Sequence, residues 1–260
     1  MQQVKRKKNN FWSLIFILLL RVFVFEPYIV PSESMSRTME NGDIVIGTKW
    51  DYGFSRLSIP IIGQFLPFWK NKIFVTNPKR GDIVCFSLDN EHAKLYTKRV
   101  IGVAGDAVQL KNGVIHINHV PVNLEYKGEY VLRHDNNKSE IMDVMQVVLP
   151  NQKKYETLRK KYANLTYMNV LSDNTEEFIV PKDHVFCMGD NMHYSYDCRF
   201  FGFAQSIPCK NIVARPRFVI FGSTSRIPYE NNWIKWIFRL PYSVLYSIVH
   251  PNWGRIGKII

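Results

Sequence analysis

The sequence predicts a mainly β protein, and three observations support this class. Short apolar runs rich in Val, Ile and Phe recur from residue 43 onward and are bounded by Gly, Asn, Asp or Pro, which is typical of strands. Asn112-Gly113 separates two such runs, and this dipeptide suits the positive φ angles of a tight hairpin turn. The sequence shows neither a glycine-rich phosphate loop nor long helices that alternate with strands, which excludes nucleotide-binding α/β folds. We therefore expect antiparallel sheets.

The first element in chain order is expected to be a membrane anchor. Residues 1–10 form a basic tail that contains KRKK, and an apolar stretch begins at Phe11. We assign residues 11–27 as one slightly short transmembrane helix, because about 20 apolar residues cross a bilayer. Arg21 lies near the end of this stretch and can extend its guanidinium to the headgroups. The positive-inside rule then places the tail in the cytoplasm and the rest of the chain outside.

A cleavable signal peptide is the alternative interpretation of this segment. A basic start followed by a short apolar core fits that description as well. However, no alanine occurs before Ala93, so the usual A-x-A cleavage sequence is missing. The nearest small-x-small sequence is Ser32-Glu33-Ser34. We favour a retained anchor.

The strand-like runs that follow the anchor divide into a core and an insertion. We assign the core β domain to residues 28–110 and 185–230, and an inserted β-rich subdomain with lysine-rich polar loops to residues 111–184. Residues 52–74 form an apolar, aromatic loop, and residues 231–260 form an amphipathic segment. We expect both to lie near the membrane, with ordinary core packing as the alternative for their aromatic side chains.

Composition and cysteine spacing restrict the partners. The chain has 260 residues, 46% of them hydrophobic, and a formal charge of +12, so it is expected to fold and to meet an anionic partner, either nucleic acid or a lipid surface. The cysteines show no C-x-x-C pair and no interleaved histidine, which disfavours a structural zinc site. We expect the cysteines to be small buried residues, and a disulfide between two of them remains an alternative. They are Cys85, Cys187, Cys198 and Cys209.

A serine and a lysine are the candidate chemical groups. Ser34 follows the anchor directly, and a serine hydroxyl needs a base that removes its proton before it attacks. In residues 96–102 the alternation of a strand places Tyr96, Lys98 and Val100 on one face. If that face is buried, the loss of water around the ammonium lowers the pKa of Lys98 and leaves an amine that can accept a proton.

Four segments in a fixed order resemble the conserved boxes of bacterial type I signal peptidase. They are EPYIVPSESM after the predicted anchor, RGDIVCF at 80–86, YTKRVIGVAGD at 96–106 and MGDNMHYSYDCRFFGF at 188–203. The resemblance extends from Arg21 to about Gly222, and the inserted region diverges. It implies an antiparallel β catalytic domain that removes N-terminal signal peptides from exported preproteins, cutting after small residues through a Ser-Lys acyl-enzyme mechanism.

The resemblance also implies roles for individual residues. By motif, Ser34 is the nucleophile and Lys98 is the general base. Ser32 and the backbone N–H of Ser34 fall where the family builds its oxyanion hole, and Ser195 falls where the family orients the lysine amine. The charged residues that match structural positions near the site are Arg99, Asp190, Asp197 and Arg199. The candidates for the substrate pocket, for which core packing is the alternative, are Val30, Met35, Met39, Val45, Tyr96 and Tyr196.

The sequence also departs from the family pattern. Arg37 replaces the family's proline two residues beyond the methionine. Tyr196 stands where a small residue usually lines the pocket. The remaining changes, all in the last box, are Met192, His193, Tyr194 and Cys198. These departures leave every candidate catalytic residue in place, but they put the shape of the pocket, and activity itself, in question.

The resemblance further implies partners and a location. We expect signal peptides and membrane lipids as partners and no nucleic acid, so the +12 charge is interpreted as attraction to lipid. No metal or organic cofactor is implied, because the two residues supply both nucleophile and base. The expected location is the bacterial inner membrane, as a single-pass protein with a cytoplasmic N-terminus and the catalytic domain on the periplasmic or outer face. Tethering enzyme and substrate in one plane raises their effective concentration.

Three alternatives remain open at this point. A self-cleaving repressor-type Ser-Lys protein shares the chemistry, but it needs a helical DNA-binding module where this chain has the predicted anchor. A Ser-His-Asp arrangement is conceivable with His193 as the base, beside Asp190 and Asp197 in sequence. A catalytically silent, membrane-anchored homologue that acts as a binding protein would account for the altered last box.

Overall fold

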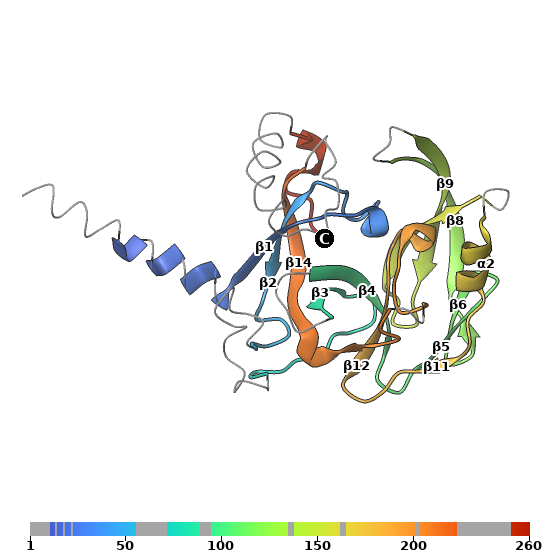
Figure 1. Ribbon diagram of the computed structural model, residues 1–260, viewed down its shortest axis with the longest axis horizontal. Helices are drawn as coiled ribbons and strands as arrows, with labels where there is room; N and C mark the ends of the chain where they lie inside the picture. The colour runs from blue at the N-terminus through green and yellow to red at the C-terminus, as the bar shows by residue number, and fades with distance from the viewer. Residues whose placement is uncertain are drawn as a thin grey trace, which may run out of the picture.

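The described part of the chain is built mainly from antiparallel strands in three sheets (Figure 1). The structure is a computed structural model, and it describes residues 11–13, 15–17, 19–21, 23–55, 72–88, 95–134, 138–161, 165–200, 203–222 and 251–260. The strand pairs of these sheets are all antiparallel. The predicted mainly β class is confirmed.

The chain enters the main sheet from an N-terminal helix. Helical residues are described between 11 and 23, and Figure 1 shows this helix projecting from the sheets. An ion-pair network joins it to the sheet: Glu26 accepts hydrogen bonds from Arg21 at 2.8 Å and lies 2.9 Å from the ammonium of Lys49, which is fully buried. Within the described residues, none of the helices has both the length and the apolar character needed to cross a bilayer. The predicted membrane span is therefore not confirmed.

The expected end of the anchor was wrong. Residues 25–27, which were assigned to the 11–27 helix, lie in strand β1 (Phe25–Ile29) and pair with the strand β2 (Ile44–Thr48). The physical reason is the buried Glu26, whose carboxylate is held by two cations at the edge of the sheet and has no counterpart in an apolar helix.

The main sheet has seven strands, in the order β1-β2-β14-β3-β4-β12-β13. The strands not yet given are β3 (Ile83–Ser87), β4 (Leu95–Val103), β12 (His184–Met188), β13 (Ile207–Pro208) and β14 (Ile212–Phe221). The connection between β1 and β2 carries a short 3-10 helix, η1 (Glu33–Met35), which contains Ser34. Because β4 lies between β3 and β12, Lys98 and the segment that follows β12 are brought to the same part of the sheet.

Two smaller sheets come from the chain between β4 and β12. One has the order β11-β5-β6-β7, from β5 (Ala107–Lys111), β6 (Val114–Ile117), β7 (Val120–Pro121) and β11 (Phe178–Ile179). The other has the order β10-β9-β8, from β8 (Asn123–Arg133), β9 (Ser139–Val148) and β10 (Lys154–Lys160). Asn112 and Gly113 connect β5 to β6 with φ angles of 49° and 73°, so the predicted hairpin is confirmed.

The lysine-rich segment in the insertion contains regular structure that the polar-loop prediction missed. β10 buries Tyr155, Thr157 and Leu158 while Lys154 remains exposed, so the polar residues masked a strand. The helix α2 (Tyr167–Asp173) follows, and Thr166 and Asn169 form a capping box at its start. Short 3-10 helices complete the described structure: η5 (Met192–Tyr194), η6 (Cys209–Asn211) and η7 (Trp253–Arg255).

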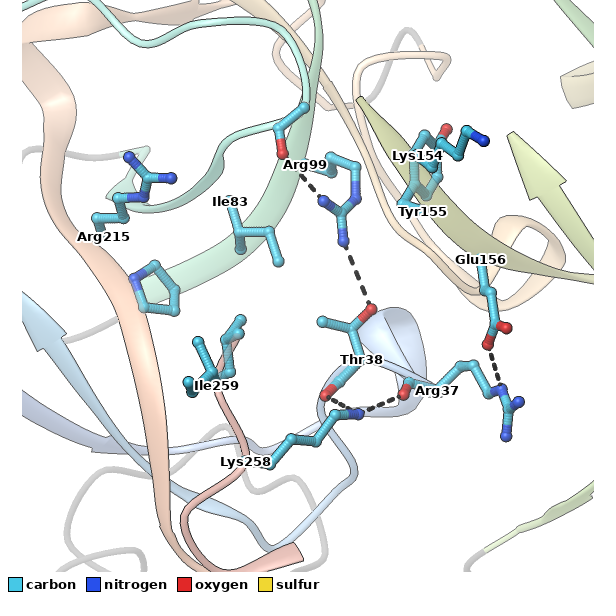
Figure 2. A pocket seen from close by; sticks show the side chains of 13 residues that line it. Arg37, Thr38, Ile83, Arg99, Lys154, Tyr155, Glu156, Arg215, Lys258 and Ile259 are labelled. Atoms are coloured by element: carbon cyan, nitrogen blue, oxygen red, sulfur yellow. Dashed lines mark hydrogen bonds and ion pairs between the residues drawn. The ribbon is translucent and has the colours of Figure 1, made fainter. Parts of the chain in front are cut away.

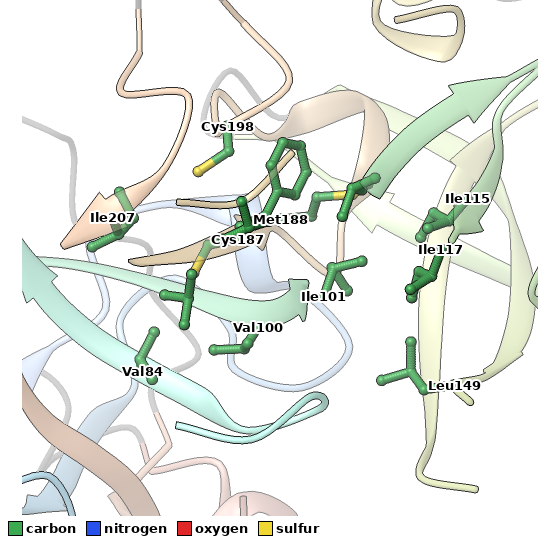
Figure 3. Packing of buried hydrophobic residues seen from close by; sticks show 14 of the residues in the cluster. Val84, Val100, Ile101, Ile115, Ile117, Leu149, Cys187, Met188, Cys198 and Ile207 are labelled. Carbon is green, nitrogen blue, oxygen red and sulfur yellow. The ribbon is translucent and has the colours of Figure 1, made fainter. Parts of the chain in front are cut away.

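The largest apolar core lies between the main sheet and the insertion (Figure 3). Ile101 on β4 and Met188 on β12 belong to the same cluster as Ile115 and Ile117 on β6. This packing joins the insertion to the two strands that border the Ser34 region. All four cysteines are buried free thiols, so no disulfide links them.

The two segments expected near the membrane are described only in part. Residues 56–71 of the 52–74 loop lie outside the described residues, and its two ends are joined by a bridge between Phe54 and Ile73. In the C-terminal segment 231–260, residues 231–250 likewise lie outside, and residues 251–260 pack beside β14, with which Ile259 pairs at Phe218. The structure thus neither confirms nor contradicts their placement near lipid.

Candidate active site

Ser34 sits on a loop that is held against the segment following β12. Its backbone oxygen accepts a hydrogen bond from the N–H of Asn191 at 3.0 Å, and the Asn191 side chain donates to the oxygen of Glu33 at 3.1 Å. Gly189 makes this approach possible, because a Cβ there would lie 2.4 Å from the Ser34 oxygen and 2.3 Å from Ser195 Oγ. Ser34 and Ser195 therefore flank the same glycine. Ser32 Oγ lies 3.2 Å from Ser34 Oγ.

Lys98 is a buried amine on β4. Lys98 is 3% exposed, and its Nζ makes neither a hydrogen bond nor an ion pair within the described residues. Burial lowers the pKa of Lys98 to about 8, although the nearby charge of Asp197 acts in the opposite direction. Arg199, also close by, lowers it further. A large fraction of this amine is therefore neutral near pH 8.

Asp197 is saturated by its own neighbours and does not bond to Lys98. Its carboxylate accepts two hydrogen bonds from the guanidinium of Arg199, at 2.8 and 2.9 Å, and one from the N–H of Gly189 at 2.9 Å. Ser195 Oγ donates to the same carboxylate at 2.6 Å, which differs from the expected bond to the lysine amine. Burial acts to raise the pKa of Asp197, but the charge and hydrogen bonds of Arg199 outweigh it, and the pKa lies below its ordinary value. The carboxylate thus stays charged beside the lysine.

Arg99 follows Lys98 on the strand and belongs to a different polar group. Its guanidinium donates two hydrogen bonds to Asp190, both at 2.7 Å, and one to the oxygen of Gly81 at 2.9 Å. Thr38 Oγ1 donates to the same Asp190 carboxylate at 2.5 Å. The ring of Tyr155 lies beneath the guanidinium, at 4.5 Å from its carbon. This group links the Ser34 loop, through Thr38, to the segment after β12.

A cavity of about 290 Å³ lies on the Arg99 side of β4 (Figure 2). Five of its thirteen lining residues are cations, and these are Arg37, Arg99, Lys154, Arg215 and Lys258. Neither Ser34 nor Lys98 contributes to it. The cavity is therefore lined by residues other than the two candidate catalytic residues.

The six predicted pocket residues do not form one surface. Val30, Met35, Met39 and Val45 are buried together in a small apolar cluster, so they pack as core. Tyr96 lies elsewhere, 5.6 Å from the ring of Phe203, and belongs to the periphery of the main core. The ring of Tyr196 lies 5.6 Å from the same Phe203, and this tyrosine is 53% exposed. The two tyrosines thus form an aromatic group with Phe203. The four aliphatic residues belong to a different cluster.

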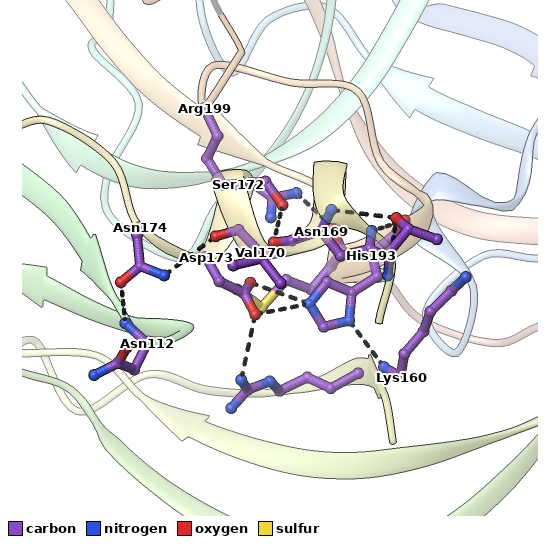
Figure 4. A network of polar contacts seen from close by, with 12 residues as sticks. Asn112, Lys160, Asn169, Val170, Ser172, Asp173, Asn174, His193 and Arg199 are labelled. Carbon is purple, nitrogen blue, oxygen red and sulfur yellow. Dashed lines mark hydrogen bonds and ion pairs between the residues drawn. The ribbon is translucent and has the colours of Figure 1, made fainter. Parts of the chain in front are cut away.

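His193 is engaged in the insertion (Figure 4). Its Nε2 lies 3.0 Å from Asp173 Oδ1, and its Nδ1 accepts a hydrogen bond from the N–H of Lys160 at 2.9 Å. Both ring nitrogens are occupied and the side chain is fully buried, which contradicts a Ser-His-Asp arrangement built on this residue with Asp190 and Asp197. In the part of the chain that is described, no group of three or more His, Cys, Asp or Glu side chains could hold a metal ion.

Some residues at the site were missed by sequence reasoning. Thr38 and Tyr155 contact the pair of Arg99 and Asp190, yet neither carries a sequence signal, because these contacts join segments that are far apart in the chain. Asn191 lies within the last of the four boxes, and its two hydrogen bonds hold the Ser34 loop in place.

Comparisons with known proteins identify the family to which the chain is similar. Residues 6–221 match the family model described as signal peptidase, peptidase S26. Signal peptidase I of Rickettsia akari (strain Hartford) is 33% identical over 224 residues, which cover 84% of this chain and 81% of that protein. Signal peptidase I of Rickettsia canadensis (strain McKiel) is 34% identical over 221 residues, with 83% and 79% covered. A solved structure of a signal peptidase I from Enterococcus faecalis V583 aligns at 21% identity and a TM-score of 0.30, covering 54% of this chain and 97% of that one.

Proposed function

The chain belongs to the signal peptidase S26 family, and from this premise we propose that it removes N-terminal signal peptides from exported preproteins with a Ser-Lys dyad, Ser34 and Lys98. Family membership supports the class of reaction, a serine peptidase acting on signal peptides. The assignment of the two residues rests on their motifs and on the surroundings described above.

The observation that carries the proposal is the state of Lys98. A buried ammonium without a partner is unfavourable, and the neutral amine removes that cost. The pKa of about 8 gives Lys98 a proton affinity suited to a general base near neutral pH. Burial thus supplies the basicity that a free lysine lacks, and no histidine is needed for it.

The reaction follows in two stages. In the first, the Lys98 amine takes the proton of Ser34 Oγ as this oxygen attacks the carbonyl carbon at the cleavage site. The backbone N–H of Ser34 and the hydroxyl of Ser32 donate to the oxyanion that develops. The Lys98 ammonium then gives its proton to the leaving amine of the mature protein, and an acyl-enzyme remains. In the second stage, Lys98 deprotonates a water molecule that attacks the ester carbonyl, and the Lys98 ammonium then returns this proton to Ser34 Oγ as the signal peptide is released.

Substrate selection and location are part of the same proposal. We assign the contact with the small side chains at the cleavage site to the aromatic group of Tyr96 and Tyr196, since the four aliphatic candidates are occupied in the core. The N-terminal anchor that precedes β1 holds the enzyme on the bilayer, with the N-terminus in the cytoplasm and the catalytic domain on the periplasmic or outer face. The basic charge favours anionic lipid.

The test uses purified full-length protein in detergent and a preprotein with a small-x-small cleavage site. We expect mature product from the unchanged protein and none above background from Ser34→Ala or Lys98→Met. Ser139→Ala and Lys182→Met change exposed residues on β9 and on the turn before β12, and these control variants should cleave normally. A folded, unchanged protein that gives no product would favour the silent binding protein instead.

A further inference from the structure

Residues 251–260 contact the loop that carries Ser34, although they lie at the opposite end of the sequence. β3 pairs with β14 only at Ile212 and Ala214, so the later part of β14 has β2 on one edge and no strand of the sheet on the other. The C-terminal segment occupies this second edge. Its backbone bonds are Val219 N to Lys258 O at 3.0 Å, Gly257 N to Val219 O at 2.8 Å and Ile260 N to Arg217 O at 2.9 Å.

Two cations of this segment extend to the Ser34 loop. The ammonium of Lys258 donates to the backbone oxygen of Arg37 at 2.8 Å and to that of Thr38 at 3.1 Å, as Figure 2 shows. Arg255 Nε lies 3.1 Å from both carboxylate oxygens of Asp43, at the far end of the same loop. Both ends of the stretch from residue 37 to 43 are therefore held by the C-terminal segment 251–260.

The backbone conformation at Arg37 explains why this support is needed. Its φ angle is 82°, in the left-handed region that non-glycine residues seldom adopt. Such a conformation persists where the surroundings over-determine it. A lysine suits the task, because its ammonium has three donors and can satisfy two adjacent carbonyls at once. Arg37 is three positions after Ser34, and Met39 N bonds back to Met35 O at 2.8 Å, so the turn is continuous with η1.

We propose that Lys258 is a positioning residue: by holding the carbonyls of Arg37 and Thr38, it keeps the Ser34 hydroxyl aligned with Lys98. The inference rests on the proposed function, and the hydrogen bonds of the Lys258 ammonium go to backbone oxygens of the loop and to neither Ser34 nor Lys98. Its effect is on alignment, where a displacement of about 1 Å can reduce a rate by about 100-fold.

The test is a steady-state analysis of the full-length protein, with the concentration of competent sites determined by titration. In Lys258→Met we expect kcat per site to fall about tenfold or more, while KM changes less than about twofold. The pH midpoint of the rate should be unchanged, because Lys98 is untouched. Lys258→Arg retains the donors and should recover most of the rate, and Lys182→Met serves as the matched control. A kcat equal to that of the unchanged protein, or a loss that arginine does not recover, would overturn the proposal.

A second measurement remains decisive if the variant folds poorly or if the unchanged protein does not cleave. Hydrogen exchange should be faster at the amides of Thr38 and Met39 in Lys258→Met, and unchanged at those of β3 and β4. If Lys258→Met does not fold, Lys258→Gln, which keeps one donor group, is measured in its place and should show an intermediate acceleration. Absence of cleavage by the unchanged protein would reject the proposed function, and unchanged exchange at both amides would reject the role of Lys258.

Discussion

Lys98 and Arg99 are neighbours on β4, and both are buried, but their pKa values are shifted in opposite directions. Arg99 has a carboxylate partner, Asp190, that accepts two of its hydrogen bonds, whereas Lys98 has none within the described residues. Burial acts to lower the pKa of Arg99, but the charge and hydrogen bonds of Asp190 outweigh it, and the pKa is raised. Burial lowers the pKa of Lys98 to about 8. The comparison teaches that a partner, more than burial, decides whether a cation becomes a structural charge or a base.

The largest expected effect comes from removal of the unpartnered amine. Lys98→Met should reduce cleavage by at least about 1,000-fold, because Ser34 loses its base. It should also raise the free energy of unfolding at pH 7 by about 3 kcal/mol. The fall of the pKa from 10.5 to about 8 measures how strongly the folded state disfavours the ammonium, and methionine removes this cost. Product formation and urea unfolding measure the two effects. Substantial cleavage, or a less stable protein, would contradict this account of Lys98.

The same pKa gives a sign for the pH dependence of stability. An unfolded lysine keeps its proton up to its ordinary pKa of 10.5, whereas the folded one releases it near 8. Between these values the unfolded state binds more protons, so this group makes the protein more stable as the pH rises. Below pH 8 the cost is fully present. Lys98→Met should lack this part of the pH dependence, with Lys182→Met as the control.

The partnered cation should behave in the reverse manner. Arg99→Met leaves the buried carboxylate of Asp190 without its partner and should lower the free energy of unfolding by about 3–5 kcal/mol. The double variant with Asp190→Asn should lose less than this, because no charge is stranded. Urea unfolding of both proteins measures the difference. A single variant as stable as the unchanged protein would show that this pair is not structural.

Ser32 offers a smaller effect at the proposed oxyanion hole. Ser32→Ala removes one donor 3.2 Å from Ser34 Oγ, and kcat should fall about 100-fold while KM stays nearly constant. Steady-state kinetics with Ser139→Ala as the control check this prediction. A change in kcat below about twofold would remove Ser32 from the mechanism.

Asp197 tests how the neighbouring charges adjust the amine. Its negative charge acts to raise the pKa of Lys98, so Asp197→Asn should lower that pKa and move the rising limb of the pH profile to lower pH by about 1 unit. The pH dependence of kcat/KM in the folded fraction measures the midpoint. A midpoint that moves to higher pH would mean that another charge controls Lys98.

The sequence could predict features that depend on residues close together in the chain, and it could not predict contacts between distant segments. Strand alternation was sufficient to separate Lys98 from Arg99, and the Asn112-Gly113 turn was local chemistry. The hydrogen bond between His193 and Asp173 and the support of the Ser34 loop by Lys258 could not be predicted, because sheet topology alone brings those segments together. Burial of the aliphatic pocket candidates likewise depended on packing against β3 and β14.

Arg37 lies between these two cases. The sequence identified it as a departure from the family's proline, but it gave no physical reason for the change. With φ at 82°, the position excludes proline, whose ring fixes φ near −65°. The left-handed turn, worth about 1–3 kcal/mol of strain, is instead held by tertiary contacts.

The pH dependence of kcat/KM for the full-length protein tests the central claim most directly. If the neutral amine of Lys98 activates Ser34, the rate should rise along a single limb with a midpoint near pH 8 and should persist in His193→Ala. A limb near the ordinary lysine value of 10.5, or one that disappears with His193, would contradict the claim.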